Sequence, residues 1–563
     1  MAKFPLKELL ILLSLAGSYA AIGERLASVG LTASLLAYLG LFALLAACLL
    51  LAAQVRIPLL RWCYALIFAA AAFYLESYER ITSEHLTYDA FINLLHSSQF
   101  AAEAARQHRA LLIGALVNPL LLFAGIALKP RRRVRSAFAA APIGGIALLA
   151  AILFVRGGEG ARGLPSPFAP LAYSGIYAWE AATGAAGARR PVQLHRDPRP
   201  VTRDIVLIVD ESVAGNYLDL GSSNGIRSGL AEPRPGLAVH NYGYAASITN
   251  CSVGTNVTLR HGGTRGDYRR INTTMPSIWD YAHRAGLRTV YIDAQRTDGI
   301  LHNLMSEDEL AEIDRFVQFD GVPVRDRDMA AADRLAALIN DGRPQLIIVN
   351  KVGAHFPVHD KYPDAFMRYR PALPRGGYEE ISDTGSREGF GGAAEDWLRY
   401  RNSYRNTLLW NVGAFFDRLL AKADLTRATI IYTSDHGQDL HERGDPGLNT
   451  HCGSDPMIEE GLVPLVVIEG GAPTQDWRRH LAANRNHVSH YEIFPTLLAL
   501  MGYNDPKLRA IYGESLLERS HDDFTFNARF NARLGLEPNW RFIDLEKVVQ
   551  PPRGDAAEPK QSL

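Results

Sequence analysis

Uncharged runs rich in Leu and Ala dominate the first 155 residues of this 563-residue chain. Several are long enough to cross a bilayer, for which a helix needs about 20 apolar residues. They are apolar on every side, whereas a helix on the surface of a soluble protein is amphipathic. We therefore expect a bundle of five transmembrane helices, over Leu9–Gly23, Leu26–Val55, Ile57–Leu75, Ala110–Leu128 and Ser136–Val155.

The first run, Leu9–Gly23, has an alternative interpretation as a cleaved signal peptide, because Lys3 and Lys7 precede it and Ser-Tyr-Ala at 18–20 has the form of a cleavage site. We favour an uncleaved helix, since further apolar runs follow at once. Basic residues gather before the first run, between the second and third, and between the fourth and fifth. The positive-inside rule places these on the cytoplasmic side. We expect a multi-pass protein of the bacterial inner membrane, with everything after Arg156 in the periplasm.

The composition of the chain divides it into segments. Residues 1–156 form the predicted transmembrane domain, residues 157–203 are rich in Gly, Pro and Ala and predict a linker, and residues 550–563 predict a disordered tail. The polar connection at 76–109 carries apolar residues at a helical period. It predicts a periplasmic interfacial helix, which either lines the approach of a lipid substrate or serves as a packing element.

Residues 204–549 read as a soluble α/β domain. Short apolar, β-branched runs alternate with helical patterns, which predicts a mainly parallel, doubly wound sheet with helices on both faces. Ligand sites in such sheets gather at the carboxyl ends of the strands. The predicted strands are Ile205–Val209, Thr289–Ile292, Leu346–Val349, Thr429–Thr433 and Val463–Ile468, and the predicted helices include Met329–Ile339, Tyr404–Leu420 and Tyr491–Met501.

Charge and cysteine content limit the partners and the redox chemistry. Basic and acidic residues number 59 each, so the chain has no basic excess and we expect no nucleic-acid partner. Cys48 and Cys63 lie in apolar runs, where we expect inert packing residues. Cys251 and Cys452 lie in the soluble part, where a periplasmic location would allow a disulfide, but the sequence leaves open whether they form one.

Three predicted strands end in residues that bind metals or phosphate. Asp210-Glu211 follows the first strand, Asn350-Lys351 and then His355 follow the third, and Ser434-Asp435-His436-Gly437 follows the fourth. One acid after a strand is commonplace, but several in one domain predict a divalent metal held by carboxylates and imidazole. Mixed oxygen and nitrogen ligands suit zinc best, with manganese possible. A hydroxyl nucleophile would come from Ser252, Thr255 or Thr258, among which spacing cannot choose.

These motifs, in this order, resemble the sulfatase-like phosphoethanolamine transferases of the alkaline phosphatase superfamily, which include the enzymes that modify lipid A. The resemblance covers nearly the whole chain and implies an amino-terminal α-helical transmembrane bundle of five spans followed by an α/β alkaline-phosphatase-like domain. Two departures mark a divergent member. Asn350 stands where the lipid A enzymes usually have another histidine, and the nucleophile loop continues into Leu259-Arg260-His261-Gly262 without a second cysteine.

The resemblance also assigns roles to residues of this chain. The Cys251-x-x-x-Thr255 match implies that Thr255 is the nucleophile, in a metal site with Glu211, Asp435 and His436. His355 and His451 would bind phosphate or act as acid and base. The remaining expected substrate contacts are Asn256, Thr258, Asn350, Lys351, His441 and His490.

The implied activity is the transfer of phosphoethanolamine from phosphatidylethanolamine to an envelope glycolipid or glycan, through a phosphothreonine intermediate. One alternative is a phosphoglycerol transferase of the same fold. A second is a sulfatase or phosphodiesterase. Sulfatases usually need Cys/Ser-x-Pro-x-Arg to make their modified nucleophile, and no such stretch surrounds Thr255. A third is an inactive scaffold, against which the joint presence of Glu211, Thr255, Asp435 and His436 argues.

Overall fold

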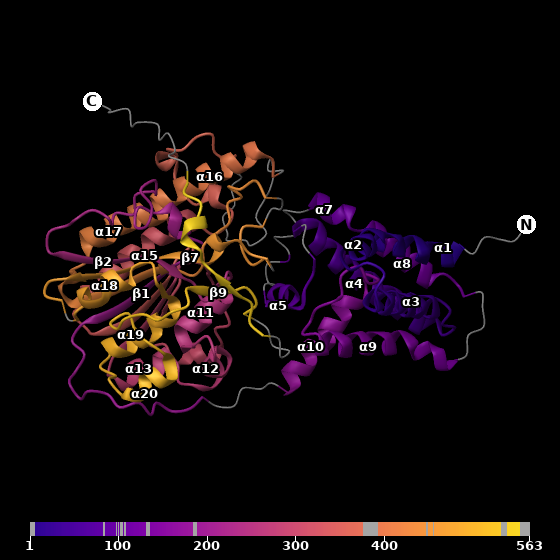
Figure 1. Ribbon diagram of the computed structural model, residues 1–563, viewed down its shortest axis with the longest axis horizontal. Helices are drawn as coiled ribbons and strands as arrows, with labels where there is room; N and C mark the ends of the chain where they lie inside the picture. Colours follow the sequence, from indigo (N-terminus) through magenta and orange to yellow (C-terminus); the bar gives the residue numbers. More distant parts are fainter. Residues whose placement is uncertain are drawn as a thin grey trace, which may run out of the picture. The chain divides into compact units, whose positions relative to one another are not determined.

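The computed structural model describes residues 6–82, 85–96, 98, 101, 105, 109–130, 136–183, 189–374, 392–445, 449–453, 455–473, 475–530 and 537–551. The chain forms two compact units that divide after Ala185. Each unit is described by itself, and Figure 1 shows the elements of both.

The first unit contains five helical stretches that are long and apolar enough to cross a membrane, which confirms the expected number. The second begins at Ala33 rather than at Leu26, because Thr32 caps it by accepting a hydrogen bond from Leu35 N. Helix α8 packs against α1 and α4, and α9 packs against α3. The stretches comprise α1 (Leu6–Leu15) with α2 (Tyr19–Val29), α3 (Ala33–Ala53), α4 (Pro58–Thr82), α7 (Arg109–Gly114) with α8 (Val117–Ala127), and α9 (Ala141–Val155).

Two further helices of this unit revise the expected segments. The predicted linker contains α10 (Phe168–Thr183), whose Phe168 and Tyr173 are buried in the same core as the apolar helices. Helix α5 (Tyr88–His96) lies in the connection predicted at 76–109. The ring of Tyr88 lies 5.6 Å from that of Tyr173, and its hydroxyl donates to Glu180 at 2.7 Å. The apolar period of this connection therefore packs onto α10, which favours the packing interpretation.

The second unit is built on an eight-stranded sheet in the order β4-β3-β5-β1-β6-β7-β2-β8. The pairs from β4 to β6 are parallel, which confirms the mainly parallel sheet, while β7 runs antiparallel to both neighbours. All five predicted strands form. The strands are β1 (Asp204–Asp210), β2 (Leu237–Ala246), β3 (Arg288–Asp293), β4 (Arg315–Val317), β5 (Gln345–Asn350), β6 (Ala428–Ser434), β7 (Leu462–Gly470) and β8 (Val488–Ser489), with β9 (Thr525–Asn527) and β10 (Trp540–Phe542) in a separate pair.

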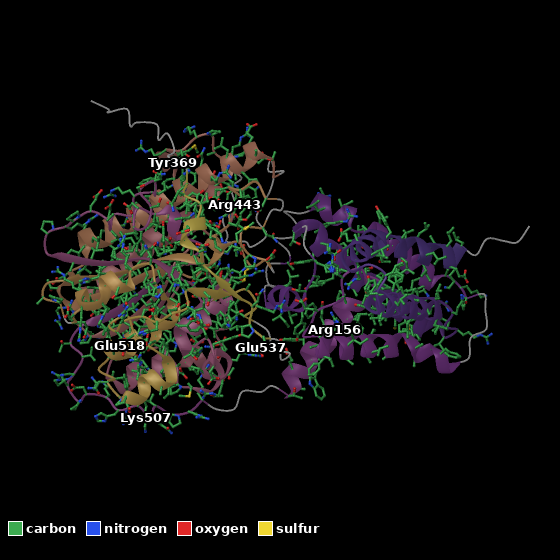
Figure 2. The ribbon with its side chains drawn as sticks, in the orientation of Figure 1. Arg156, Tyr369, Arg443, Lys507, Glu518 and Glu537 are labelled. Atoms are coloured by element: carbon green, nitrogen blue, oxygen red, sulfur yellow. A yellow bond between two sulfur atoms is a disulfide. The ribbon has the colours of Figure 1, made fainter. Side chains whose placement is uncertain are left out.

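Helices cover both faces of this sheet, because alternate side chains of each inner strand point to opposite faces. Val206 and Ile208 of β1 belong to the core under α15, α16 and α17, and Leu207 belongs to the core under α11, α13, α19 and α20 (Figure 1). Figure 2 shows side chains filling the space between these layers. The helices are α11 (Ser252–His261), α12 (Tyr268–Thr274), α13 (Ile278–Arg284), α14 (Glu307–Ala311), α15 (Val324–Ile339), α16 (Ala394–Leu408), α17 (Phe415–Lys422), α18 (Arg478–Asn484), α19 (Ile493–Leu500) and α20 (Pro506–Tyr512).

The last described residues are hydrogen-bonded to the second unit. Asn216 donates to Val549 O at 2.7 Å and Asn224 donates to Pro551 O at 3.2 Å. The predicted disordered tail therefore does not begin at 550, and its residues 552–563 lie outside the described part of the chain.

Candidate metal centre and nucleophile

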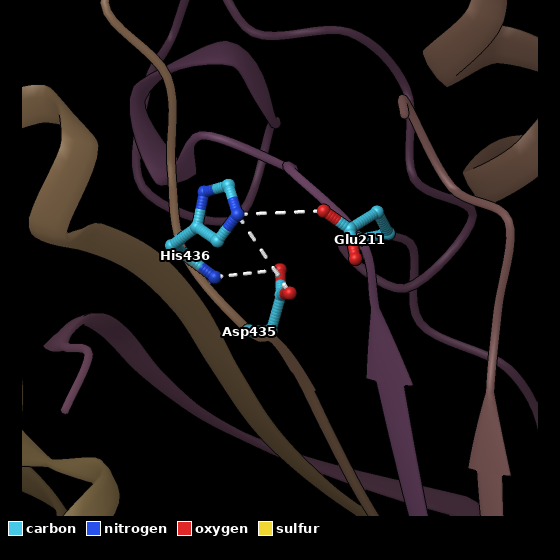
Figure 3. Close-up of side chains that lie close together, drawn as sticks. All are labelled: Glu211, Asp435 and His436. Atoms are coloured by element: carbon cyan, nitrogen blue, oxygen red, sulfur yellow. Dashed lines mark hydrogen bonds and ion pairs between the residues drawn. The ribbon is translucent and has the colours of Figure 1, made fainter. Parts of the chain in front are cut away.

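Glu211, Asp435 and His436 converge at the carboxyl edge of the sheet. Glu211 follows β1, and Asp435 and His436 follow the adjacent strand β6. His436 Nε2 lies 3.4 Å from Glu211 Oε1 and 3.7 Å from Asp435 Oδ2, and all three side chains are buried (Figure 3). Their ligand atoms lie within 4.8 Å of one another, so they could hold a metal ion. The sequence predicted this set.

Close backbone approaches bring these side chains together. Asp435 N donates to Asp210 O at 2.8 Å, and Ser212 N donates to Asp435 Oδ1 at 3.0 Å. Ser212 has a φ of 60°, a left-handed conformation that non-glycine residues adopt at some cost and that often marks functional sites. Gly353, in the loop after β5, has a φ of +54°, and a Cβ there would lie 2.5 Å from Glu211 O. The loop that leads to His355 can therefore press against the Glu211 backbone only with glycine at 353.

The hydrogen bonds of the cluster leave the atoms that a cation requires. His436 Nδ1 lies 2.7 Å from Gly437 O, which fixes a hydrogen on Nδ1 and directs Nε2 at the carboxylates, where a cation that displaced the Nε2 proton would meet its lone pair. Asp435 Oδ1 accepts from Ser212 N and from His436 N, whereas Asp435 Oδ2 is buried without a hydrogen-bond partner among the described residues. Two carboxylates and one imidazole with an orphaned oxygen fit a bound metal ion.

The electrostatics of the cluster call for an added positive charge. Burial, with the nearby charge of Glu211, raises the pKa of Asp435 to about 8. Burial opposes ionisation of Glu211 too, but the hydrogen bond from His436 and the charges of His355 and His436 hold its pKa well below the usual range. The pKa of His436 rises to about 9 because Asp435 and Glu211 outweigh its burial. A cation placed among these groups would take over the role of the protons.

Ser252 is the hydroxyl that the structure places against this cluster. Its Oγ lies 3.2 and 3.3 Å from the two carboxylate oxygens of Glu211, and 3.2 Å from His436 Nε2. Ser252 is the first residue of α11 and is partly exposed, so a substrate can reach it. Backbone N–H groups at a helix amino terminus also favour a bound anion such as phosphate.

Thr255, the nucleophile and metal ligand implied by the resemblance, occupies a different position. Its Oγ1 lies 3.5 Å from Thr249 O, and the side chain is fully buried one turn further into α11. A buried hydroxyl bonded to a backbone carbonyl cannot approach a phosphorus atom without rearrangement. The contacts therefore favour Ser252, one of the alternatives that the sequence left open, over Thr255.

A disulfide links the segment that carries Ser252 with the segment that carries His451. Cys251 and Cys452 are bonded, with their Cα atoms 4.9 Å apart, which answers the question that the sequence left open. The His451 ring stacks on His436 at 4.5 Å between centroids. His355 Nδ1 lies 2.7 Å from Phe356 O, and its charge acts on Glu211. Both histidines that were predicted to bind phosphate thus lie beside the cluster.

The other predicted contacts on α11 and β5 bond within the protein. Asn256 donates to Ser252 O at 3.0 Å, and Thr258 donates to Asn272 Oδ1 at 3.3 Å. Lys351 is fully buried and donates to Asp210 Oδ2 at 2.8 Å. These three side chains thus bond within the protein, and their role as substrate contacts stays a prediction.

His441 and His490 are likewise held by the protein. His490 Nε2 lies 2.7 Å from Thr433 Oγ1, and burial lowers the pKa of His490 to about 3, so the ring stays neutral. His441, with Asp439 and Asp445, forms a second group whose atoms could hold a metal. However, Nδ1 of His441 lies 2.6 Å from Asp445 Oδ2 and Nε2 lies 2.9 Å from Asn449 O. Both ring nitrogens of His441 thus already have oxygen partners within the protein.

Gln295, in the loop after β3, is a neighbour of the candidate metal centre, and the sequence analysis did not identify it. Its Nε2 donates to Glu211 Oε2 at 3.0 Å. No motif marks this residue, and its position just past the predicted strand Thr289–Ile292 is the one signal that could have suggested it. Asn350, a predicted substrate contact, donates to Asp293 Oδ1 at 3.2 Å and so belongs to the same network.

The sulfatase family model matches residues 203–503, more than half of the chain. Among characterised proteins, the chain is similar to Kdo(2)-lipid A phosphoethanolamine 7''-transferase of Escherichia coli (strain K12), with 23% identity over 377 residues. That match covers 61% of this chain and 60% of the relative.

A solved structure of a membrane protein shows a similar fold. The integral membrane protein lipooligosaccharide phosphoethanolamine transferase A (EptA) from Neisseria meningitidis matches with a TM-score of 0.63 and 18% identity, over 89% of this chain and 96% of that chain. The C-terminal periplasmic domain of EcEptC from Escherichia coli, in complex with Zn, matches with a TM-score of 0.46 and 16% identity, over 61% of this chain and 94% of that chain.

Proposed function

The chain belongs to the sulfatase family, and from that premise we propose that it is a membrane-bound, metal-dependent phosphoethanolamine transferase that forms a covalent intermediate on Ser252. Relatives named for phosphoethanolamine transfer support the activity. Five helices able to cross a membrane support a lipid donor, because a catalytic domain that acts on a lipid must be held at the bilayer surface. We place the protein in the bacterial inner membrane, with its second unit in the periplasm.

The contact of Ser252 Oγ with Glu211 and His436 carries the proposal. Glu211, Asp435 and His436 would hold the ion, for which their oxygen and nitrogen ligands suit zinc, with manganese as the second choice. When bound, the ion lowers the pKa of a hydroxyl next to it and offsets the negative charge that builds up on a phosphoryl group.

In the first half-reaction, Ser252 Oγ attacks the phosphorus of phosphatidylethanolamine and forms a new O–P bond. The bond from phosphorus to the diacylglycerol oxygen breaks, and diacylglycerol leaves after accepting a proton. In the second half-reaction, a hydroxyl or phosphate of an envelope glycolipid or glycan attacks the same phosphorus and frees Ser252. His355 and His451, which flank the cluster, bind the phosphoryl oxygens and move the protons. Two such half-reactions give ping-pong kinetics.

Intact-mass measurement of the full-length protein in detergent tests the proposal. After incubation with phosphatidylethanolamine and zinc, the wild-type chain should gain one phosphoethanolamine group. Ser252→Ala should gain none, because it lacks the attacking oxygen. Thr255→Val, which keeps the shape of the buried side chain, should still form the adduct.

An adduct that persists in Ser252→Ala and disappears in Thr255→Val would return the nucleophile to Thr255. A glycerophosphate adduct, formed from phosphatidylglycerol alone, would identify the phosphoglycerol transferase alternative. Absence of any adduct in the wild type, with release of a soluble product, would identify a hydrolase.

A further inference from the structure

We propose that Gln295 is a positioning residue that fixes the Glu211 carboxylate for cation binding; the inference rests on the proposed metal centre. The Gln295 side chain is 2% exposed. Its Nε2 lies 3.0 Å from Glu211 Oε2, 2.9 Å from Lys351 O and 3.4 Å from Asn350 Oδ1. A carboxamide nitrogen has two hydrogens, and the two shorter contacts use them. Gln295 therefore ties the Glu211 carboxylate to the backbone of the neighbouring strand end.

The two oxygens of Glu211 have different partners. Oε1 accepts from Ser212 Oγ at 2.9 Å, and Ser252 Oγ contacts both oxygens. In the proposed reaction, Ser252 loses its hydrogen and bonds to phosphorus, so it can no longer donate to Glu211. Gln295 then remains as a donor to Oε2 through both half-reactions. Without it, one oxygen of a buried carboxylate would lose a fixed partner, and the carboxylate could turn away from the ion.

Gln295 can hold Glu211 because its own position is fixed from two sides. Its backbone N donates to Asp293 Oδ1 at 3.0 Å, and its backbone O accepts from Arg327 Nη1 at 3.2 Å. Asp293 is a buried anion: burial opposes its ionisation, but the charge of His302 and the hydrogen bonds it accepts lower its pKa. Asp293 also accepts hydrogen bonds from His302, Asn350 and Gln318.

This network runs along the edge where three neighbouring parallel strands, β3, β5 and β1, end. It starts at Asp293 of β3, which accepts from Asn350 of β5 and from the Gln295 backbone, and the Gln295 side chain then reaches Glu211 after β1. At position 350, asparagine donates to Asp293, and its Oδ1 lies 3.4 Å from Gln295 Nε2. The network thus orients a metal ligand with neutral amides, which leave the charge of the centre unchanged.

The zinc dissociation constant of the full-length protein in detergent, measured by competition with a chromogenic chelator, tests this role. Gln295→Leu removes the donor at nearly constant volume and should weaken zinc binding by about 10–100-fold, the usual effect of removing an outer partner of a ligand. Gln295→Met also removes the donor at nearly constant volume and should weaken zinc binding to a similar extent. Because two different substitutions are made at position 295, the test still works if one of the two variants fails to fold.

Gln345→Leu is the matched control. Gln345 is fully buried at the opposite, amino-terminal end of β5, where its side chain donates to Leu338 O at 3.2 Å. The Gln345→Leu variant should lower the melting temperature of the metal-free protein about as much as Gln295→Leu does. Its zinc affinity should stay at the wild-type value. Glu211→Gln should abolish tight binding.

Wild-type zinc affinity in Gln295→Leu, with loss of binding in Glu211→Gln, would overturn the role of Gln295 and leave the metal centre intact. Wild-type affinity in Glu211→Gln would overturn the metal centre itself, and the role of Gln295 with it.

Discussion

Removal of the Cys251–Cys452 disulfide should weaken both the fold and the reaction. The bond joins residues 201 positions apart, between the start of α11 and the loop that carries His451. A cross-link stabilises mainly by restricting the unfolded chain, and the chain-entropy relation for such a long loop gives an upper value of about 5 kcal/mol. Native disulfides typically contribute about 2–4 kcal/mol, the range we expect here.

The loss of activity should be partial, because other bonds also join these segments. Cys452 N donates to Asn250 O at 3.0 Å, and Asn250 Nδ2 donates to Glu460 Oε2 at 2.9 Å. These contacts persist after reduction. However, Cys452 has a left-handed φ of 62°, which the cross-link helps to maintain. Its release should let His451 drift from His436 and from the phosphoryl group on Ser252.

Tryptophan fluorescence during heating, together with adduct formation by intact mass, measures both effects. At about 2 °C per kcal/mol for a domain of this size, Cys251→Ala/Cys452→Ala should lower Tm by about 4–8 °C. The adduct should form more slowly but not disappear. Cys48→Ala/Cys63→Ala is the control, because these two cysteines are not in a disulfide. An unchanged Tm together with an unchanged rate would refute the reasoning.

Two further predictions concern buried charges. Lys351→Met should leave Asp210 and Asp328 without their buried cation and lower the free energy of unfolding by about 3–5 kcal/mol. The loss should be seen as a low yield of folded protein. A stable variant with a raised KM would show that Lys351 binds substrate instead. Burial raises the pKa of Glu492 to about 8; the charge of Asp522 adds to this effect and that of Arg265 opposes it. The contribution of Glu492 to stability is therefore fully present below about pH 4 and is lost as pH rises through 8. Tm should therefore fall between pH 6 and pH 9, and a slope that is as steep in Glu492→Gln as in the wild type would contradict this cause.

Much of the fold could be predicted because burial leaves a clear pattern. The β-branched runs at 205–209 and 346–349 are buried on both faces of the sheet, and the runs of the first unit are apolar on every side, so composition alone identifies both. Helix α10 was missed because Gly, Pro and Ala dominate its surroundings and hide a short apolar face. Strand β2 was missed because polar residues and Gly243 interrupt it, at a bulge opposite β7.

The grouping of the candidate metal ligands could be predicted for a different reason. Strands β1 and β6 are adjacent and parallel, so residues just past their ends must meet. The proposed nucleophile could not be chosen from the sequence, because Ser252 and Thr255 lie on one helix. Which of them reaches the cluster depends on where that helix begins. The structure begins α11 at Ser252, with Cys251 as its cap. Polar networks such as that of Gln295 leave no periodic signal at all.

The position of Ser252 also sharpens the distinction between a transferase and a sulfatase. A serine that follows the Cys/Ser-x-Pro-x-Arg pattern needs proline two residues later and arginine four residues later. Counted from Ser252, this chain has Gly254 and Asn256. A Cβ at Gly254 would lie 2.5 Å from the Phe530 ring, and Asn256 bonds back to Ser252 O, so both residues serve the packing of the helix. Ser252 is therefore expected to act as an unmodified hydroxyl, which suits a phosphoryl intermediate that an acceptor can resolve.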